Sequence, residues 1–213
     1  MEPGPQLFVS IEALPGEATL ARLRAALTAS AISSVLLTPG EASGGAIDAA
    51  GVAPLVALIQ AHNAAALIED DAALARTLNA DGVHLTPRDD VEEAYVSARE
   101  ILGQDRIVGA VITGSRHDAM SLAEMGADYI AFAGPERDGL VVWWAEMFVV
   151  PCVALGVATE AEAQGLAQNG VDFIGLQISA AVPVDEIQAH VQAIAGCLAR
   201  DGAAAGLRGR AAS

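Results

Sequence analysis

One phrase occurs three times in this chain and limits the folds that are open to it. It reads Asn-Ala-Asp-Gly-Val-His-Leu at residues 79–85, Gly-Ala-Asp-Tyr-Ile-Ala-Phe at 126–132 and Gly-Val-Asp-Phe-Ile-Gly-Leu at 170–176. Each copy follows an Ala-rich stretch with helical spacing and opens a short apolar run, so the end of a helix leads directly into a buried strand. The copies lie about two strand–helix units apart, which is typical of a parallel barrel.

Further short apolar runs complete the set of strands. They are apolar throughout, which indicates burial on both faces, as in a parallel sheet covered by helices. The stretches between them have helical spacing, for example residues 18–28 with Leu20, Leu23 and Leu27 on one face. We predict an α/β fold of the (β/α)8 TIM barrel class, with a doubly wound open sheet as the alternative. The predicted strands are Leu7–Ile11, Ser34–Leu37, Ala65–Ile68, Gly82–Leu85, Ile107–Ile112, Tyr129–Ala133, Cys152–Leu155 and Phe173–Leu176.

We expect a single domain over residues 1–201. Of the 213 residues 53% are hydrophobic but only 4% are aromatic, so Ala, Val, Leu and Ile build one core. Residues 202–213 are rich in Gly and Ala and are predicted to form a flexible tail. Neither a membrane span nor a basic, apolar leader is visible, so we expect a cytoplasmic protein with no membrane partner. Cys152 and Cys197 lack metal or redox spacing and should be buried.

The charged residues exclude several kinds of chemistry. All 11 basic residues are Arg, while Asp and Glu number 27, which gives a formal net charge of −16. A field of this sign disfavours binding to nucleic acid. Without lysine, Schiff-base chemistry is excluded, and so is a phosphate site that relies on an ammonium group. A ligand must therefore be held by Arg, by backbone amides or by a metal.

Carboxylates follow two neighbouring predicted strands. In a (β/α)8 barrel the chemistry lies at the carboxyl ends of the strands. Residues 69–71, Glu-Asp-Asp, end the third strand, and residues 86–90, Thr-Pro-Arg-Asp-Asp, follow the fourth. Asp70 and Asp89 could share Mg²⁺, which usually takes one or two protein carboxylates together with substrate oxygens. The alternative is that these or the adjacent Asp residues cap the third and fourth helices.

A second group of residues follows the seventh and eighth predicted strands. Gly156 comes directly after the seventh strand, and Ile178 and Ser179 follow the eighth. Barrels commonly bind phosphate at these loops through backbone N–H groups and a helix N-terminus, which needs no lysine. This interpretation predicts a small phosphorylated molecule as the partner. The alternative is a plain turn glycine and a serine cap.

The order of these motifs resembles the thiamine phosphate synthase and thiazole tautomerase superfamily. The similarity covers roughly residues 60–180, and Ala-Asp-Gly-Val-His-Leu is its most specific part. The segments at 115–120 and 142–146 are similar to a divergent branch of the alphaproteobacterial type. The matching motifs are Ala80–Leu85 with Asp89, Gly126–Ile130, Pro151–Gly156 and Gly170–Phe173.

The resemblance implies a transferase of thiamine biosynthesis. Such an enzyme joins hydroxymethylpyrimidine pyrophosphate to thiazole phosphate, and Mg²⁺ is its implied cofactor. Position by position, the resemblance implies that Asp70 and Asp89 lie near the metal. It also implies that Gly156 and the pair Ile178-Ser179 hold the thiazole phosphate.

Two loops depart from the family pattern. The loop after the second strand, where the family carries Gln, Arg and Lys, reads Thr-Pro-Gly at residues 38–40. The loop after the sixth strand, where the family carries Thr-x-Thr-Lys, is short and acidic at residues 134–139. Cations stabilise the charge of departing pyrophosphate, so Arg88, Arg116 and Arg137 are the candidates to replace those that are missing.

His117 offers a second hypothesis, that of a proton-transfer enzyme. Thiazole tautomerases use a histidine after the fifth strand, and His117 lies in that loop. Imidazole is a suitable acid–base group near neutral pH. The alternative places His117 in the first turn of the fifth helix. We expect His84 to pack inside the barrel, and His62 and His190 to lie on the surface.

A third hypothesis is a non-catalytic relative that binds a phosphorylated ligand or a protein. It predicts a filled or acidic barrel mouth. Adjacent Trp143 and Trp144 are expected to anchor the core or an interface, which makes a homodimer through their helix a further hypothesis.

Overall fold

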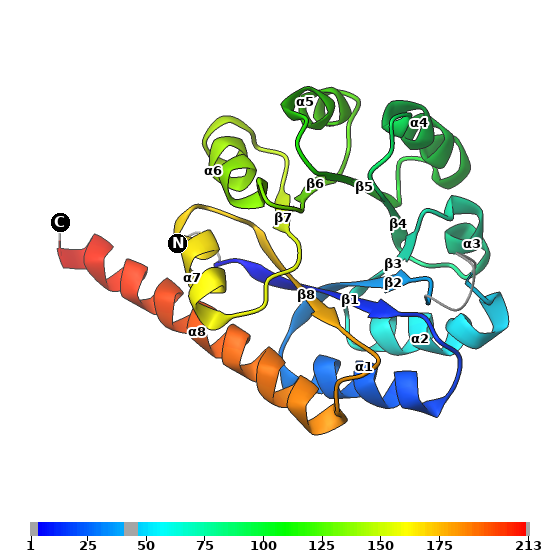
Figure 1. Cartoon of the computed structure of the whole chain (residues 1–213), viewed down its shortest axis with the longest axis horizontal. Helices are drawn as coiled ribbons and strands as arrows, with labels where there is room; N and C mark the ends of the chain where they lie inside the picture. Colours follow the sequence, from blue (N-terminus) through cyan, green and yellow to red (C-terminus); the bar gives the residue numbers. More distant parts are fainter. Residues whose placement is uncertain (1–3, 41–46, 212–213) are drawn as a thin grey trace.

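The strands of the computed structural model close into one barrel with the helices around its outside (Figure 1). The structure describes residues 4–40 and 47–211. Within these residues eight parallel strands pair in sequence order, and β8 closes the ring against β1. The prediction of a (β/α)8 barrel is confirmed, and closure excludes the open sheet. The strands are β1 (Gln6–Glu12), β2 (Ile32–Thr38), β3 (Ala65–Glu69), β4 (Gly82–Leu85), β5 (Ile107–Ile112), β6 (Tyr129–Phe132), β7 (Cys152–Ala154) and β8 (Phe173–Ile178).

A helix follows each strand. The last helix, α8, is the longest and packs against α1 and α7. It continues over residues 202–211, for which the sequence predicts a flexible tail, and residues 212–213 lie outside the described part of the chain. The flexibility of this segment stays a prediction. The helices are α1 (Glu17–Ala29), α2 (Ala49–Ala61), α3 (Ala72–Thr77), α4 (Val91–Leu102), α5 (Arg116–Glu124), α6 (Arg137–Met147), α7 (Glu160–Gln168) and α8 (Val184–Ala211).

The core has two shells, which explains why the strands are apolar on both faces. The outer shell fills the space between strands and helices and includes Leu23 and Leu27 of α1, as the helical spacing predicts. Trp144 is also fully buried there, and both cysteines are buried thiols rather than halves of a disulfide. The inner shell, inside the barrel, consists of Phe8, Leu36, Leu67, Val111, Tyr129, Ala131 and Val153. Among the described helices, none has both the length and the apolar character that a membrane crossing requires.

The Asp of the repeated phrase is a structural clamp at the amino end of the barrel. In each copy its carboxylate accepts a hydrogen bond from a backbone N–H at the start of the preceding strand. The residue two positions earlier, Asn79, Gly126 or Gly170, has a φ of 54°, 94° or 83°, which lets the chain leave the helix. The clamps join Asp81 to Ala66, Asp128 to Val108 and Asp172 to Cys152, with N···O distances of 2.8, 2.7 and 2.8 Å.

Candidate active site

The carboxyl ends of the strands meet at one end of the barrel, which we call the mouth. Acidic side chains come to it from several strand ends and from the loops and helices that follow. Burial, and then the charge of neighbouring Asp70, raises the pKa of Glu69 above its ordinary value. The acidic residues of the mouth include Glu12, Glu69, Asp70, Asp89 and Asp118.

Asp70, the first residue after β3, is bound to the loop after β4. Its φ of 53° is left-handed, a conformation that Asp adopts more readily than most residues. Its N–H donates to the carbonyl of His84 at 3.0 Å. Its carboxylate accepts from the backbone N–H of Thr86 at 2.9 Å and from the Thr86 hydroxyl. Nη2 of Arg88 lies 2.6 Å from Oδ1 of the same carboxylate, so both oxygens of Asp70 have donors.

The N-cap positions belong to the Asp residues that follow. Asp71 caps α3 by accepting from the backbone N–H of Leu74 at 2.8 Å. Asp90 occupies the N-cap of α4, although no hydrogen bond from that helix to its side chain occurs in the described residues. The capping alternative is therefore confirmed for Asp71, whereas the side chain of Asp70 serves the neighbouring loop.

A cavity of about 260 Å³ lies between the loops after β4 and β5. Two of the predicted site residues, Arg88 and Asp89, line it together, and Asp70 lies beside it through its ion pair. Sequence reasoning missed the opposite wall, because nothing in the spacing of Ser115 and Asp118 distinguishes a pocket from a helix start. The polar lining residues are Arg88, Asp89, Thr113, Ser115 and Asp118.

The structure places His117 and Arg116 in the first turn of α5. The side chain of His117 is exposed, and His117 is not among the described residues that line the adjacent cavity. The guanidinium carbon of Arg116 lies 4.7 Å from the ring centroid of Trp143 on α6, a cation–π contact. This position agrees with the first-turn alternative for His117, and its role in proton transfer stays a prediction.

A second cavity of the mouth, of about 450 Å³, lies against the loops after β7 and β8. Gly156, with a φ of 73°, and Ile178 both line it, as the phosphate interpretation expects. Ser179 does not line it in the described structure, and its hydroxyl oxygen accepts from the backbone N–H two residues later at 3.2 Å. Glu186 and His190 of α8 complete the wall, so the cavity also contains a negative charge.

A buried polar pair lies inside the barrel below the mouth. His84 Nδ1 is 2.6 Å from the hydroxyl of Tyr129, and the ring of Phe8 packs near both. Burial lowers the pKa of His84 to about 4, against a smaller opposing effect of Asp70. Burial also raises the pKa of Tyr129 well above its ordinary value. The Tyr129 ring fits because residue 109 is Gly, where an added Cβ would lie 2.2 Å from the ring.

Comparison with known proteins identifies the family. The family described as thiamine monophosphate synthase matches residues 7–180. The chain belongs to this family. A curated thiamine-phosphate synthase of Erythrobacter litoralis is 39% identical over 156 residues, which cover 67% of this chain and 70% of the relative. Another from Rhodospirillum centenum is 39% identical over 168 residues, which cover 72% and 78%. The resemblance and its alphaproteobacterial branch are thereby confirmed.

Solved structures share the barrel of this thiamine monophosphate synthase family member. Thiamine phosphate pyrophosphorylase from Pyrococcus furiosus has a TM-score of 0.70 at 20% identity and covers 91% of this chain and 96% of its own. The (S)-3-O-geranylgeranylglyceryl phosphate synthase of Thermoplasma acidophilum has a TM-score of 0.69 at 16% identity and covers 92% and 93%. At such identities the likeness establishes the fold alone.

The divalent metal that the family resemblance implies does not fit the residues as they are placed. Both carboxylate oxygens of Asp70 already accept from Thr86, and a guanidinium is bound to one of them. Within residues 4–40 and 47–211 no cluster of three or more His, Cys, Asp or Glu side chains could hold a metal ion by itself, so Mg²⁺ bound here would need oxygens from a substrate beside Asp70 and Asp89. Asp89 and Asp70 therefore do not form a preformed Mg²⁺ site in this member of the synthase family.

Arg137 is a candidate to replace the missing cations of the family, but its guanidinium is used in contacts within the fold. It is only 9% exposed at the start of α6. Its Nη1 donates to the carbonyl of Leu155 at 2.8 Å, its Nε donates to Asp138 at 2.8 Å, and its Nη2 pairs with Glu162. These contacts connect the loops after β6 and β7. Of the three candidates, Arg88 and Arg116 remain accessible at the mouth, since both are exposed.

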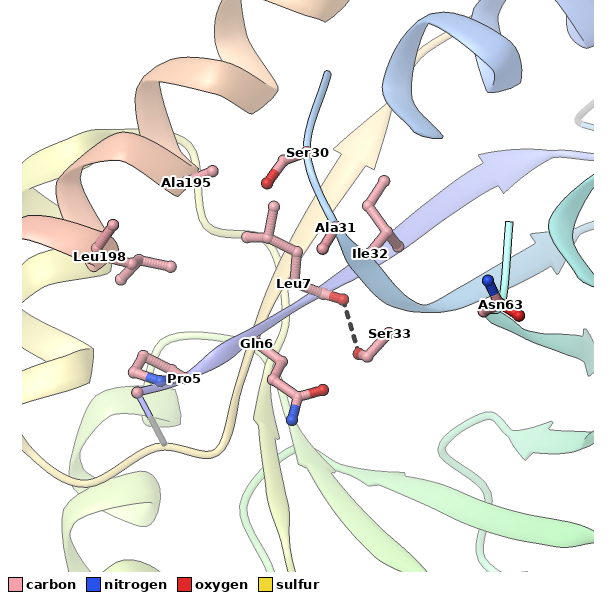
Figure 2. Close-up of a pocket in the computed structure, with 12 residues that line it drawn as sticks. Pro5, Gln6, Leu7, Ser30, Ala31, Ile32, Ser33, Asn63, Ala195 and Leu198 are labelled. Carbon is pink, nitrogen blue, oxygen red and sulfur yellow. Dashed lines mark hydrogen bonds between the residues drawn. The ribbon is translucent and has the colours of Figure 1, made fainter. Parts of the chain in front are cut away.

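A wider cavity, of about 560 Å³, lies at the amino end of the barrel. Figure 2 shows it between the starts of β1 and β2 and the side chains of Ala195 and Leu198 from α8. Ser33 Oγ donates to the carbonyl of Leu7 at 2.8 Å across its wall. In barrels of this class that end serves stability rather than chemistry, so the candidate site of the synthase family member lies at the mouth.

Proposed function

We propose that this protein is a thiamine-phosphate synthase that joins hydroxymethylpyrimidine pyrophosphate to thiazole phosphate. The observation that carries the proposal is the family match over residues 7–180. Relatives at 39% identity are named for this reaction. Two cavities at the carboxyl ends of the strands, where barrels of this class have their chemistry, support it further.

The two cavities suggest where each substrate binds. We assign the thiazole phosphate to the cavity at Gly156 and Ile178, because backbone N–H groups of these loops can hold phosphate without a lysine. We assign the pyrophosphate to the cavity at Arg88, whose guanidinium suits phosphate oxygens, with Arg116 as a second contact. Ser179 belongs to the proposal as a further contact at the rim, whereas His117 belongs to the tautomerase alternative as its acid–base group.

The proposed reaction requires little covalent chemistry from the protein itself. Pyrophosphate leaves the pyrimidine, and the thiazole nitrogen attacks the carbocation that remains. A cation held beside the departing group stabilises its charge, which lowers the barrier to this step. We assign that task to Arg88, which lines the cavity. Binding of both substrates at the barrel mouth would make the attack effectively unimolecular.

The test is turnover by the purified full chain with both substrates, followed by chromatography of thiamine phosphate. We expect product with the wild type and a loss of about 100-fold or more in Arg88→Gln, as for the loss of one charge-stabilising donor. Arg24→Gln is the matched control, because Arg24 is an exposed residue of α1 that is not among the described residues lining either cavity of the mouth. Failure of the wild type to turn over while it still binds thiazole phosphate would contradict the synthase proposal.

One observation favours a second candidate, a non-catalytic relative that binds a phosphorylated ligand. The mouth is acidic, with Glu12, Glu69, Asp89 and Asp118 around it, as that hypothesis predicts. The same assay separates the two, because the relative would bind thiazole phosphate without turnover. The tautomerase alternative requires His117 at the cavity, and this histidine is exposed outside its wall.

We propose three further features of this protein. They are a place in the cytoplasm, the absence of a nucleic-acid partner and a homodimer through the helix that contains Trp143. In this helix Trp144 is buried against Phe132 and Phe148, so Trp143, which is half-buried, is the residue available to a second copy. A monodisperse monomer in light scattering would overturn the dimer.

A further inference from the structure

The pair formed by Arg88 and Asp70 departs from what the family implies for this site. Family resemblance implies that Asp70 binds a divalent metal, yet in this chain its carboxylate lies 2.6 Å from Nη2 of Arg88. The two side chains are 33% and 32% exposed, so bulk water screens their attraction only in part. Guanidinium groups in general carry a positive charge in proteins.

Thr86 fixes the geometry of this pair. Its carbonyl accepts from Nε of Arg88 and its hydroxyl oxygen from Nη2, each at 3.4 Å. Its backbone N–H and hydroxyl donate to the two oxygens of Asp70. A divalent ion that approached Asp70 would have to displace the guanidinium and break the contacts to Thr86. The guanidinium would also repel it.

Arg88 also faces the neighbouring cavity, which it lines together with Asp89. Guanidinium has five N–H donors, and the contacts of Arg88 within the described residues use Nε and Nη2. The Nη1 hydrogens are left for a ligand. Asp89 has Asp118 as its acidic neighbour in this cavity, and within the described residues these carboxylates belong to no group of three or more side chains that could hold a metal ion without a substrate.

We infer that Arg88 is a built-in cation that takes the place of the divalent metal at Asp70, so that this site works without Mg²⁺. Asp70 acts as a positioning residue that holds the guanidinium toward the cavity. Any anionic ligand of the cavity therefore meets a guanidinium rather than a metal ion. The inference does not depend on the proposed turnover, because metal binding can be measured without substrate.

The experiment is titration with Mn²⁺, a probe for Mg²⁺ sites, followed by the electron paramagnetic resonance signal of the free ion. The wild-type chain should leave this signal at the level of Arg24→Gln, the control. Arg88→Gln frees the carboxylates and should gain one saturable Mn²⁺ site. This site should bind Mn²⁺ at least about tenfold more tightly than the wild type does, because an adjacent opposite charge shifts the binding of a cation to a carboxylate by about that factor. Arg88→Lys keeps a positive charge and should gain no such site.

The double variant Arg88→Gln, Asp70→Asn should lose the gained site, which assigns it to Asp70. Circular dichroism checks that each variant is folded. One saturable Mn²⁺ site in the wild type that Asp70→Asn removes would overturn the inference, and so would a folded Arg88→Gln variant that gains none. Absence of thiamine phosphate formation, by contrast, would bear on the proposed function and leave the metal result intact.

Discussion

At the scale of single residues, the buried His84 makes stability depend on pH. Its folded pKa of about 4 lies below the ordinary value of 6.5, because burial disfavours the charged imidazole. The unfolded chain therefore binds the proton more readily. The stability that depends on neutral His84 is complete above pH 6.5 and is lost as the pH falls toward 4. We expect this loss to reach about 3 kcal/mol, measured as the free energy of unfolding in urea between pH 7.5 and pH 4.

His84→Gln isolates this effect, since other groups also titrate in the same range. Glutamine can keep a hydrogen bond to Tyr129 but takes up no proton, so the variant should lose less stability than the wild type as the pH falls. His190→Gln removes an exposed imidazole of α8 and should follow the wild-type curve. If the free energy of unfolding fell in parallel with pH in the wild type and in His84→Gln, the pH dependence would not come from His84.

At the scale of the elements, the Asp clamps of the repeated phrase hold neighbouring βα units together. Asp172, just before β8, accepts from the buried backbone N–H of Cys152 at the start of β7. Asp172→Ala leaves this N–H without its partner and should cost about 1–3 kcal/mol of the free energy of unfolding, measured in urea at pH 7.5. Asp172→Asn keeps an acceptor oxygen and should cost less.

Asp105→Ala provides the baseline for this experiment, because it removes an exposed Asp from a turn before β5. Equal losses in the Ala and Asn variants of Asp172 would mean that its charge, rather than the hydrogen bond, is what stabilises the structure. Equal losses of unfolding free energy in Asp172→Ala and Asp105→Ala would mean that the clamp contributes nothing to stability.

The elements themselves could be predicted because local pattern determines them. Strands buried on both faces leave uninterrupted apolar runs, and β4 and β5 have the predicted bounds. Hydrogen bonds across the loops leave no such pattern. The sequence places Arg88 and Arg137 at equivalent strand ends, yet one pairs with Asp70 at the mouth and the other is buried with Glu162. Whether such an arginine lies at the mouth or is buried depends on loop conformation, including the left-handed φ of Asp70, and on acidic partners distant in sequence.

At the scale of the whole molecule, charge should oppose the approach of substrate. The formal net charge is −16, and the mouth adds Glu12 and Glu69 to the carboxylates around the cavities. Thiazole phosphate is an anion, so the field of the protein repels it. Raising the salt concentration from about 10 mM to about 150 mM shortens the Debye length from about 30 Å to about 8 Å and screens this repulsion. KM for thiazole phosphate should therefore fall with salt, by roughly twofold to tenfold.

Steady-state kinetics over a series of NaCl concentrations at constant pH measures this dependence, and Glu69→Gln locates its origin. Removing one negative charge from the mouth should lower KM most at low salt and flatten the dependence of KM on salt. Asp105→Ala removes a negative charge just before the amino end of β5, opposite the mouth, and should change KM little. A KM that rises with salt would mean that Arg88 and Arg116 dominate the local potential despite the net charge. Attraction by these two guanidinium groups would then outweigh the acidic mouth at the distance where substrate is captured.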